Sequence, residues 1–511
     1  MHAEEGASSL LLRHASPQDA AESLAALCGI APENFSYAGP QRDPALHGIN
    51  AMLARCRHLQ LGGRDWPSDL PRPLPEDVKA YRSAAWLEHL RAIHAACLAG
   101  RPRLLRSPLH HRDVPVLGEV LADSHQIYLA LHDRELFFFV FVGRLPQGVY
   151  YPARDLFLML RPNALDPRNA TWRVLRLLLP EPQRVARFVA RALAGALRLA
   201  LVVGDPRPGH YLKESLAYLD AAEADIIGFR RRGGLLVLLE DWCAMDPLAV
   251  IPTLAEGPVQ RLQSTGAALA LLDAGVDAHR VYRFKTAEGP GWLRRRFGLS
   301  ALADPARGGR FRLMLSVDAE RARLLNQAEV FRFVLRRLGA ACAARGLAME
   351  VAWDGWTISG EPTEKDRMVM ARIEAAIAAI KQDLGVAIAS EIRLFGRSAY
   401  EKVAEIAPCD LVLTTQGTGA LLPSWLLERP TIVYHVAAMV PNRSDLHEPT
   451  VVQLDQRAVI EEAEGDAQHG SRFTLALWGV EDALLRAVGE KLGLEPELLP
   501  PPFTGEGRAG G

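Results

Sequence analysis

Apolar residues recur with two different periods along the chain. Residues 1–115 carry helical spacing, as in "PQDAAESLAALCGI" and "EDVKAYRSAAWLEHLRAIHAACLAG", with a Pro- and Gly-rich link between them. From residue 116 onward, short apolar runs alternate with longer amphipathic stretches, which is typical of strands and helices in an α/β protein. The run "QIYLALHDRELFFFVFVG" predicts two strands joined by a turn at Asp133 and Arg134.

The alternation of strand-like and helix-like segments occurs in two series. The first contains "RLALVVGDPRPGHYLKESLAYLDAAEADIIGF", which reads as strand, loop, helix and strand. The stretch "ALADPARGGR" predicts a linker, after which a second series begins at "RFRLMLSVD". The predicted fold class is therefore α/β, with an N-terminal helical extension (1–115), two α/β domains (116–305 and 306–495) and a disordered tail (496–511). Two such domains in tandem predict a cleft between them, with ligands beyond the carboxyl ends of the strands.

Composition narrows the classes of partner. The 511 residues include 59 Lys and Arg against 60 Asp and Glu, so a net charge of -1 gives no general attraction to nucleic acid. Six scattered cysteines without a CxxC pair suit a reducing compartment. The N-terminus lacks the pattern of a signal peptide, and the longest apolar stretch contains three arginines. We therefore expect a cytoplasmic protein without a transmembrane segment, with room for peripheral membrane association through a partner.

Two clusters of polar residues favour an ordinary structural interpretation. The triplets 230–232 and 294–296 are all arginine, and runs of this kind are most often solvated surface turns. His110 and His111 have only Asp113 nearby, so we expect a turn with two exposed histidines and no metal site.

The stretch "CDLVLTTQGTGALLPSWLLERPTIVYH" interrupts a predicted buried strand with Gln416, Gly417, Thr418 and Gly419. Backbone N–H groups at the start of a helix form an anion site, and glycines let a diphosphate approach them closely. Thr418 and Gln416 would add side-chain donors. A tight strand-to-helix turn also favours glycine, and the spacing alone leaves both interpretations open.

A second strand end carries His210 and Glu214, in "VVGDPRPGHYLKESLAYL". The two residues are four apart and lie on the same face of the predicted helix. His210 is a candidate general base or a hydrogen-bond partner for a sugar or phosphate, and equally a capping residue.

Further charged residues lie at strand ends of the second series. Asp318, Arg321 and Arg323 follow "RFRLMLS", where an arginine could reach a diphosphate; a charged first helical turn is the alternative. Asp354 ends "AMEVAWD", where a carboxylate could accept hydrogen bonds from hydroxyl groups. Lys402 lies on the helix just before the glycine-bearing strand.

Three segments resemble the capsular-polysaccharide glycosyltransferase family, which also includes plant xylan-decorating enzymes. "GHYLKESLAYL" is similar to its "HWLxExLPRL" segment, "ERARLLNQAEV" to its "R-x-x-N-E" helix start and "TTQGTGALLPSWLLERPTIV" to its "GPHGAGLTNLLFxxPG" loop. The segments occur in the family's order within residues 204–435. Gln416 replaces the family's loop histidine, and Ser316-Val317 replaces its serine-arginine pair, so Arg321 or Arg323 must substitute for that arginine.

The resemblance implies a GT-B architecture, in which two Rossmann-like domains face each other across a cleft. It makes 116–305 the acceptor-side domain and 306–495 the nucleotide-sugar-side domain. The implied enzyme is an inverting, metal-independent glycosyltransferase with no cofactor beyond its nucleotide-sugar donor, acting on a glycan or glycolipid acceptor in surface or capsular polysaccharide synthesis. The sequence has no DxD-like pair at a strand end.

Within this reading, His210 is the expected base, Glu214 orients it, and Asp318 is the alternative base. Gln416, Gly417, Thr418, Gly419, Arg321, Arg323, Asp354 and Lys402 form the expected donor site. Two rival functions stay open: an isomerase similar to nucleotide-sugar 2-epimerases, and a degenerate GT-B scaffold or carbohydrate-binding protein.

Overall fold

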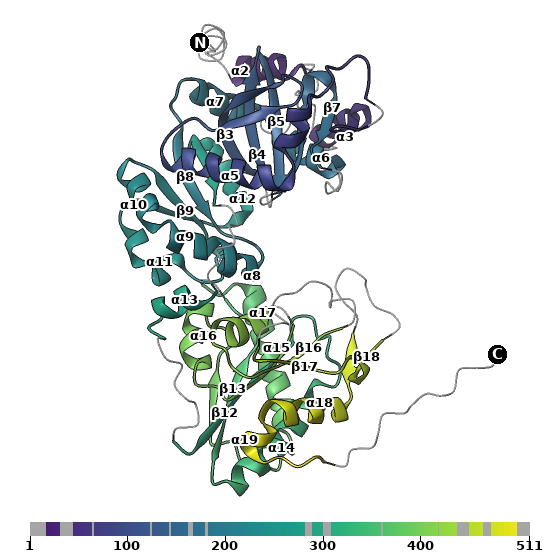
Figure 1. Ribbon diagram of the computed structural model, residues 1–511, viewed down its shortest axis with the longest axis vertical. Coiled ribbons are helices and arrows are strands. Elements are labelled where there is room, and N and C mark those ends of the chain that lie inside the picture. Colours follow the sequence, from purple (N-terminus) through teal and green to yellow (C-terminus); the bar gives the residue numbers. More distant parts are fainter. Residues whose placement is uncertain are drawn as a thin grey trace, which may run out of the picture. The chain divides into compact units, whose positions relative to one another are not determined.

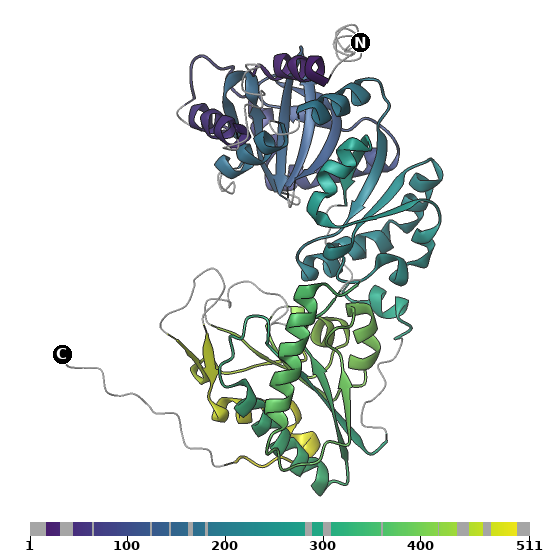
Figure 2. The same cartoon turned by 180° about the vertical axis from the view of Figure 1, so that it is seen from behind.

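The computed structural model describes residues 17–30, 44–63, 66–122, 125–142, 145–161, 167–178, 182–281, 289–299, 308–358, 361–416, 418–436, 449–462 and 472–497. The chain divides into two compact units, Met1–Cys243 with Pro252–Thr286 and Ala244–Ile251 with Ala287–Gly511. We refer to these as unit 1 and unit 2 (Figures 1 and 2).

Unit 1 contains a seven-stranded sheet that is mostly antiparallel. Its described strands lie in the order β1-β7-β6-β5-β4-β3-β2, and β1 pairs in parallel with β7. The bounds of these strands are β1 Arg57–Gln60, β2 Leu104–Ser107, β3 Arg112–Ala122, β4 His125–His132, β5 Glu135–Val142, β6 Leu145–Tyr151 and β7 Leu156–Met159.

Helices cover both faces of this sheet. One apolar core joins strand residues such as Leu129 and Phe138 to α2 (Pro17–Cys28), α3 (Pro44–Arg55), α6 (Pro167–Leu178) and α7 (Pro182–Leu193). The other core joins Tyr128 and Phe139 to α4 (Pro75–Ala80) and α5 (Ser83–Leu98). Burial of both faces explains why β4 and β5 read as continuous apolar runs. The predicted hairpin is confirmed, and its turn residues Asp133 and Arg134 have the positive φ angles, 46° and 66°, of a tight two-residue turn.

The prediction of an N-terminal helical extension is wrong for the described part of residues 1–115. Strands β1 and β2 come from this region and join the seven-stranded sheet, and the boundary expected at residue 115 falls inside β3. Both strands have only four residues, "RHLQ" and "LLRS", so they carry too little apolar pattern to be recognised. Their partners are also distant in sequence, since Arg57 pairs with Leu156.

A second, wholly parallel sheet of unit 1 follows. Its described strands lie in the order β10-β9-β8-β11, which is 3-2-1-4 in chain order. Leu121 of β3 packs with Ala200 and Val202 of β8, so the two sheets of unit 1 share a core. The bounds in this region are β8 Arg198–Val203, α8 Pro208–His210, the π-helix η3 Tyr211–Leu216, α9 Ala217–Ala221, α10 Glu223–Arg231, β9 Leu235–Leu239, η4 Glu240–Trp242, η5 Pro252–Ala255, β10 Val259–Leu262, α12 Ser264–Asp273 and β11 Val276–Arg280.

Unit 2 is a parallel sheet with helices on both faces. Its described strands lie in the order β14-β13-β12-β15-β16-β17, which is 3-2-1-4-5-6 in chain order and is the Rossmann order. The strand bounds are β12 Arg310–Ser316, β13 Ala348–Asp354, β14 Ser390–Arg393, β15 Leu411–Thr415, β16 Thr431–Tyr434 and β17 Val451–Gln453, with a separate antiparallel pair of β18 Val459–Glu461 and β19 Phe473–Leu475.

The helices of unit 2 are sorted by the alternation of side chains along its strands. Phe311, Leu313 and Leu315 face α14, α15 and α18, whereas Val433 packs with Ala420 on the opposite face. The helix bounds are α11 Pro247–Val250, α13 Gly291–Arg296, α14 Gln327–Ala344, α15 Glu364–Lys381, α16 Ala399–Ile406, α17 Thr418–Ala420, the π-helix η6 Leu421–Leu426, η9 Gln456–Ala458, α18 Leu477–Leu484, the π-helix η10 Leu485–Gly489 and α19 Glu490–Leu492. The predicted α/β class is thus confirmed for two parallel sheets that resemble Rossmann-like units. Residues 301–307 of the expected linker (301–310) and residues 498–511 of the expected tail (496–511) lie outside the described residues.

Candidate functional site

The strand order of unit 2 indicates a ligand site at the carboxyl ends of its central strands. Strands β12 and β15 are neighbours. After β12 the chain continues to β13 on one side of this pair, and after β15 it continues to β16 on the other side. In open α/β sheets, ligands bind at such a switch point, beyond the carboxyl ends of the strands. Ser316 ends β12 and Thr415 ends β15, so the segments after these two residues frame the candidate site.

Gly419 explains part of the glycine pattern after β15. A Cβ atom added at this position would lie 2.5 Å from the Thr414 hydroxyl oxygen and 3.5 Å from that of Ser316. The first distance is far below van der Waals contact, so only glycine lets the start of α17 pack against both strand ends. Gly417 lies outside the described residues, as does the side chain of Thr418.

Gln416 occupies the place where the sequence leaves β15. Its side chain is buried, and its backbone N–H donates a hydrogen bond of 3.1 Å to the carbonyl oxygen of Tyr434 on β16. The next residue on that strand end is His435, which is also buried and lies 3.2 Å from the side chain of Gln456, Nδ1 to Nε2. His435 was not predicted, although it is the last residue of the stretch quoted in the sequence analysis. Because Thr415 pairs with Tyr434, the next residue, His435, lies beside the glycine loop.

Asp318 and Arg323 lie close together at the end of β12. The Asp318 N–H donates to the side-chain oxygen of Gln327 at 2.7 Å, and the Asp318 carboxylate accepts the Arg323 N–H at 3.2 Å. The Arg323 guanidinium lies 3.7 Å from the same carboxylate, and both side chains are mostly buried. Arg321 differs, because its side chain is 53% exposed and its nearest acidic neighbour is Glu320 at 4.0 Å.

Tyr434 contributes a further polar group to this edge. Its hydroxyl is buried, and burial raises its pKa above the ordinary value; the charge of Asp318 acts in the same direction and that of Arg323 opposes it. The pairing of β15 with β16 therefore brings a neutral phenol near the Asp318–Arg323 pair, a contact that no spacing along the sequence indicates.

Asp354 and Lys402 were expected to contact the donor, and the structure joins them to each other. The Lys402 ammonium group lies 2.6 Å from the Asp354 carboxylate, 2.7 Å from the Thr357 hydroxyl oxygen and 3.4 Å from the Trp356 carbonyl oxygen. Both side chains are almost fully buried. Three acceptors match the three N–H groups of a lysine, so the pair fixes α16 against the end of β13.

The loop after β8 carries the second set of candidate residues, in unit 1. Gly204 has a φ of 147°, and an added Cβ atom would lie 2.9 Å from that of Leu239, so the strand end requires glycine. His210 follows in α8, and its Nδ1 atom lies 3.2 Å from Glu214 Oε1. His210 is 39% exposed whereas Glu214 is 6% exposed, so a buried carboxylate orients a half-exposed imidazole.

Both candidate loops lead into a π-helical turn, Tyr211–Leu216 after the first and Leu421–Leu426 after the second. Such turns occur often at functional sites, because they widen a helix and change the direction of its side chains. The second turn is held at its end by Arg294, which donates to the Leu426 carbonyl oxygen at 2.6 Å and pairs with Glu428.

Two structural interpretations of the sequence need correction. Arg294 belongs to an arginine triplet expected to be solvated, and Arg230 of the other triplet is buried and donates to the Pro258 carbonyl oxygen. His110 and His111 are half-buried: His110 contacts Ser107, and His111 lies 2.7 Å from the buried carboxylate of Asp77. The sequence pattern shows no sign of these distant partners.

Arg280 of β11 supports the His210 loop and was not predicted. Its guanidinium donates to the Gly204 carbonyl oxygen at 2.9 Å and lies 3.6 Å from the Asp205 carboxylate. It also lies over the ring of Trp242, 5.1 Å from the centroid. A sequence signal did exist, because "VDAHR" places three ionisable residues in a strand whose five positions are all buried.

Within the described ranges, no helix is both long and apolar enough to span a bilayer. The same residues contain no group of three or more His, Cys, Asp or Glu side chains suited to hold a metal ion.

Comparison with known proteins gives little further guidance. No family model matches the sequence, and no curated protein does. Among solved structures, the E. coli heptosyltransferase WaaC with ADP-2-deoxy-2-fluoro heptose matches at 12% sequence identity and a TM-score of 0.23. The match covers 51% of this chain and 94% of that one. A TM-score this low does not define a common fold, so the strand orders of the two parallel sheets carry the fold assignment.

Proposed function

We propose that this protein is a glycosyltransferase that moves a sugar from a nucleotide-sugar donor to a glycan or glycolipid acceptor in surface or capsular polysaccharide synthesis. The observation that carries the proposal is the close packing of Gly419 on Ser316 and Thr414 at the switch point of a Rossmann-ordered sheet. This packing places the backbone around Gly419, which has no side chain, at the carboxyl ends of the strands, where such sheets bind nucleotides.

The donor diphosphate is the ligand that this edge suits best. Amide N–H groups at the start of the segment that follows β15 would meet it, and Gly417 and Thr418 keep their proposed role as its contacts. Arg323 follows the end of β12, and its partner Asp318 sets its position. Charge that develops on the departing diphosphate would thus be met by fixed donors, which stabilises the transition state most.

His210 is the proposed base of the transfer step. A hydrogen bond from Nδ1–H to Glu214 leaves the lone pair on Nε2, the state needed to accept a proton. His210 takes the proton of the acceptor hydroxyl, whose oxygen bonds to the anomeric carbon as the bond from that carbon to the diphosphate breaks. The reaction is inverting in this proposal, and proton NMR of the new linkage tests that outcome.

A binding experiment tests the donor site directly. Isothermal titration calorimetry of the full chain with UDP, GDP, ADP and CMP should show binding of at least one of them. Arg323→Ala should weaken that binding by about tenfold or more, since a charge-assisted contact to phosphate is worth about 1.5–3 kcal/mol. Arg321→Ala is the comparison variant. Its side chain is 53% exposed and lies near Glu320, so the substitution should change the affinity less than about twofold.

A non-catalytic carbohydrate-binding protein is the second candidate. The observation that favours it is the mutual pairing of Lys402 with Asp354, which occupies two side chains expected to contact the donor. Absence of heat with every nucleotide would support this candidate and contradict the transferase. Conversion of a nucleotide sugar without an acceptor would instead indicate an isomerase of the 2-epimerase kind.

A further inference from the structure

A pocket lies on unit 1, apart from the loops described above. It has a volume of about 530 Å³ and lies among α5, α9 and α10. This volume is within the range of small-molecule sites, about 300–1,000 Å³. Apolar side chains and the rings of His94 and Tyr218 line it, with Arg91, Arg232 and Asp225 as its charged residues.

Gly228 indicates that the space in this pocket is kept open. It lies inside α10, where glycine costs about 1 kcal/mol relative to alanine. Packing does not require that choice, because an added Cβ atom would meet only the flexible end of Arg232, at 3.5 Å. Gly228 lines the pocket. The absence of a side chain at this position therefore enlarges the pocket, and it does not serve the close approach of another helix.

The charges of the pocket favour an anion. Among the described residues, Arg91 and Arg232 form no ion pair with a carboxylate; Arg232 donates to the Leu98 carbonyl oxygen. Asp225 offsets one of the two positive charges, which leaves one in excess. An arginine at the rim of a pocket binds carboxylate and phosphate groups in preference to neutral ones.

The inner wall of the pocket is aromatic. His94 and Tyr218 meet edge to face, with ring centroids 4.6 Å apart and an interplanar angle of 84°. His94 Nδ1 lies 3.0 Å from His279 Nε2, and burial lowers the pKa of His94, so its ring is neutral near pH 7. A neutral aromatic wall suits the apolar face of a ring.

We propose that this pocket binds a small ring compound that carries one phosphate or carboxylate group, at a site separate from the candidate donor site. The ring packs on Tyr218 and His94 in the space left by Gly228, and the anionic group contacts Arg91 and Arg232. This inference does not depend on the proposed transferase activity.

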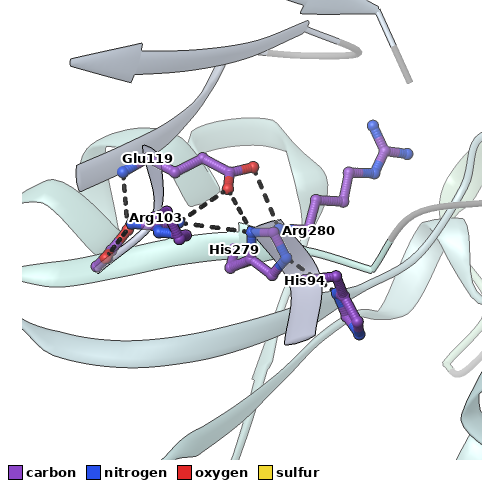
Figure 3. A network of polar contacts seen from close by, with 6 residues as sticks. His94, Arg103, Glu119, His279 and Arg280 are labelled. Atoms are coloured by element: carbon purple, nitrogen blue, oxygen red, sulfur yellow. Dashed lines mark hydrogen bonds and ion pairs between the residues drawn. The ribbon is translucent and has the colours of Figure 1, made fainter. Parts of the chain in front are cut away.

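The pocket connects to the loop of His210 through buried polar contacts. Figure 3 shows that His279 links His94 to Glu119. Arg280, the next residue, holds the Gly204 carbonyl oxygen. A ligand against His94 thus contacts a network that also supports the strand end before His210. Binding in the pocket should therefore be measurable at that loop by hydrogen exchange.

Thermal shift and calorimetry with the full chain test the proposal. The probes are glucose 1-phosphate, uridine 5′-monophosphate and benzoate, with glucose and inorganic phosphate as partial probes that each lack one of the two features. We expect at least one of the three complete probes to raise the Tm and to bind more than tenfold more tightly than either partial probe.

Variants of Gly228 identify where such a probe binds. The Cβ atom of a substituted residue 228 meets no backbone atom. Gly228→Phe should therefore fill the pocket and abolish binding, whereas Gly228→Ala leaves most of the space and should retain it. Arg91→Ala should weaken binding by about two- to fivefold, because the Arg91 side chain is exposed to solvent. Circular dichroism and the Tm without ligand confirm that each variant is folded. Unchanged binding by Gly228→Phe of the nucleotide that calorimetry assigns to the donor site separates this pocket from that site.

Three results would overturn the proposal. One is that none of the three ring compounds binds; another is that Gly228→Phe binds them as the unmodified protein does. Binding of inorganic phosphate as tight as that of the ring compounds would also contradict it, because the aromatic wall would then contribute nothing.

Discussion

His279 and Glu119 lie 2.8 Å apart, Nδ1 to Oε2, and neither side chain is exposed to solvent. Burial lowers the pKa of His279 to about 3, helped by the charge of Arg103, while burial raises the pKa of Glu119. Arg103 contacts Asp277 and Glu119, so it supplies the positive charge of this cluster. The network joins β3 of the antiparallel sheet to β11 of the parallel sheet, and it makes the stability of unit 1 depend on pH.

His279 predicts a loss of stability in acid. In the unfolded chain its pKa is about 6.5, so between about pH 6.5 and pH 3 the unfolded state binds a proton that the folded state does not. The free energy of unfolding should therefore fall by up to about 1.4 kcal/mol per pH unit as pH decreases through this window. In urea titrations, His279→Gln should show a shallower decrease than the unmodified protein. Parallel curves would contradict the prediction.

Glu119 should act in the opposite direction. Its raised pKa means that the folded state keeps a proton that the unfolded state releases above about pH 4.5. That contribution to stability is present at low pH and is lost as pH rises through the folded-state pKa. Glu119→Gln, which keeps the shape without the titration, should be relatively more stable than the unmodified protein at higher pH. The comparison requires urea titrations at pH 5 and pH 8.

The contact between Gly419 and Thr414 predicts that a substitution at one position destabilises the protein and that a second substitution at the other restores stability. Gly419→Ala places a methyl group 2.5 Å from the Thr414 hydroxyl oxygen and should destabilise the protein by about 1–3 kcal/mol. Nucleotide binding, if present, should be lost with it. Thr414→Ala removes that oxygen, so the double variant should recover stability, which urea unfolding would measure as a coupling energy.

Gly489→Ala is the matched control for this clash. It lies in η10, and its added Cβ atom would meet Leu485 at an ordinary 3.6 Å. This variant should be neutral or slightly stabilising. If it costs as much as Gly419→Ala, the effect at Gly419 reflects helical glycine in general and not the contact with β15.

The buried pair of Lys402 and Asp354 should be a structural requirement. Lys402→Met leaves an uncompensated buried carboxylate and should cost about 3–5 kcal/mol, as seen by urea unfolding. Asp354→Asn in the same chain should recover part of that loss. Lys365→Met, which breaks an exposed pair with Glu320, should cost less than about 1 kcal/mol.

Kinetics distinguish the roles of His210 and Glu214. The donors are sugars linked to the nucleotide that calorimetry identifies. His210→Ala should lower kcat by about 10²–10⁴-fold, the usual contribution of a general base. Glu214→Gln should lower it less and move the pH profile of kcat, because the carboxylate acts through the imidazole. Arg207→Ala changes an exposed residue of the same loop and should leave kcat unchanged. Near-full turnover of His210→Ala would exclude it as the base.

The sequence predicted the parts of the fold whose strands are long or follow each other closely. Strand β12 and the strand-loop-helix unit around Gly419 carry local patterns of burial, and these are where expected. Strands β1 and β2 were missed because four residues hold too little pattern and their partners are distant in sequence.

Long-range partners also explain what was missed at the candidate sites. Spacing alone brought His210 to Glu214, because helical geometry fixes residues four apart. It could not show that Lys402 meets Asp354, that His435 lies beside Gln416, or that Arg280 holds Gly204, since each pair joins separate elements. Polar residues inside buried strands, as in "VDAHR", are the signal that such partners exist.

The parallel pairing of β1 with β7 has a practical consequence for anyone who shortens the chain. A truncated form that begins after Gln60 would leave one edge of β7 open to other molecules and would strip Leu24, Cys28 and Met52 from the apolar core. Such a fragment should aggregate on expression. Despite their weak sequence pattern, β1 covers this edge of the sheet and α2 and α3 complete its core, so all three must be kept in any expressed piece of unit 1.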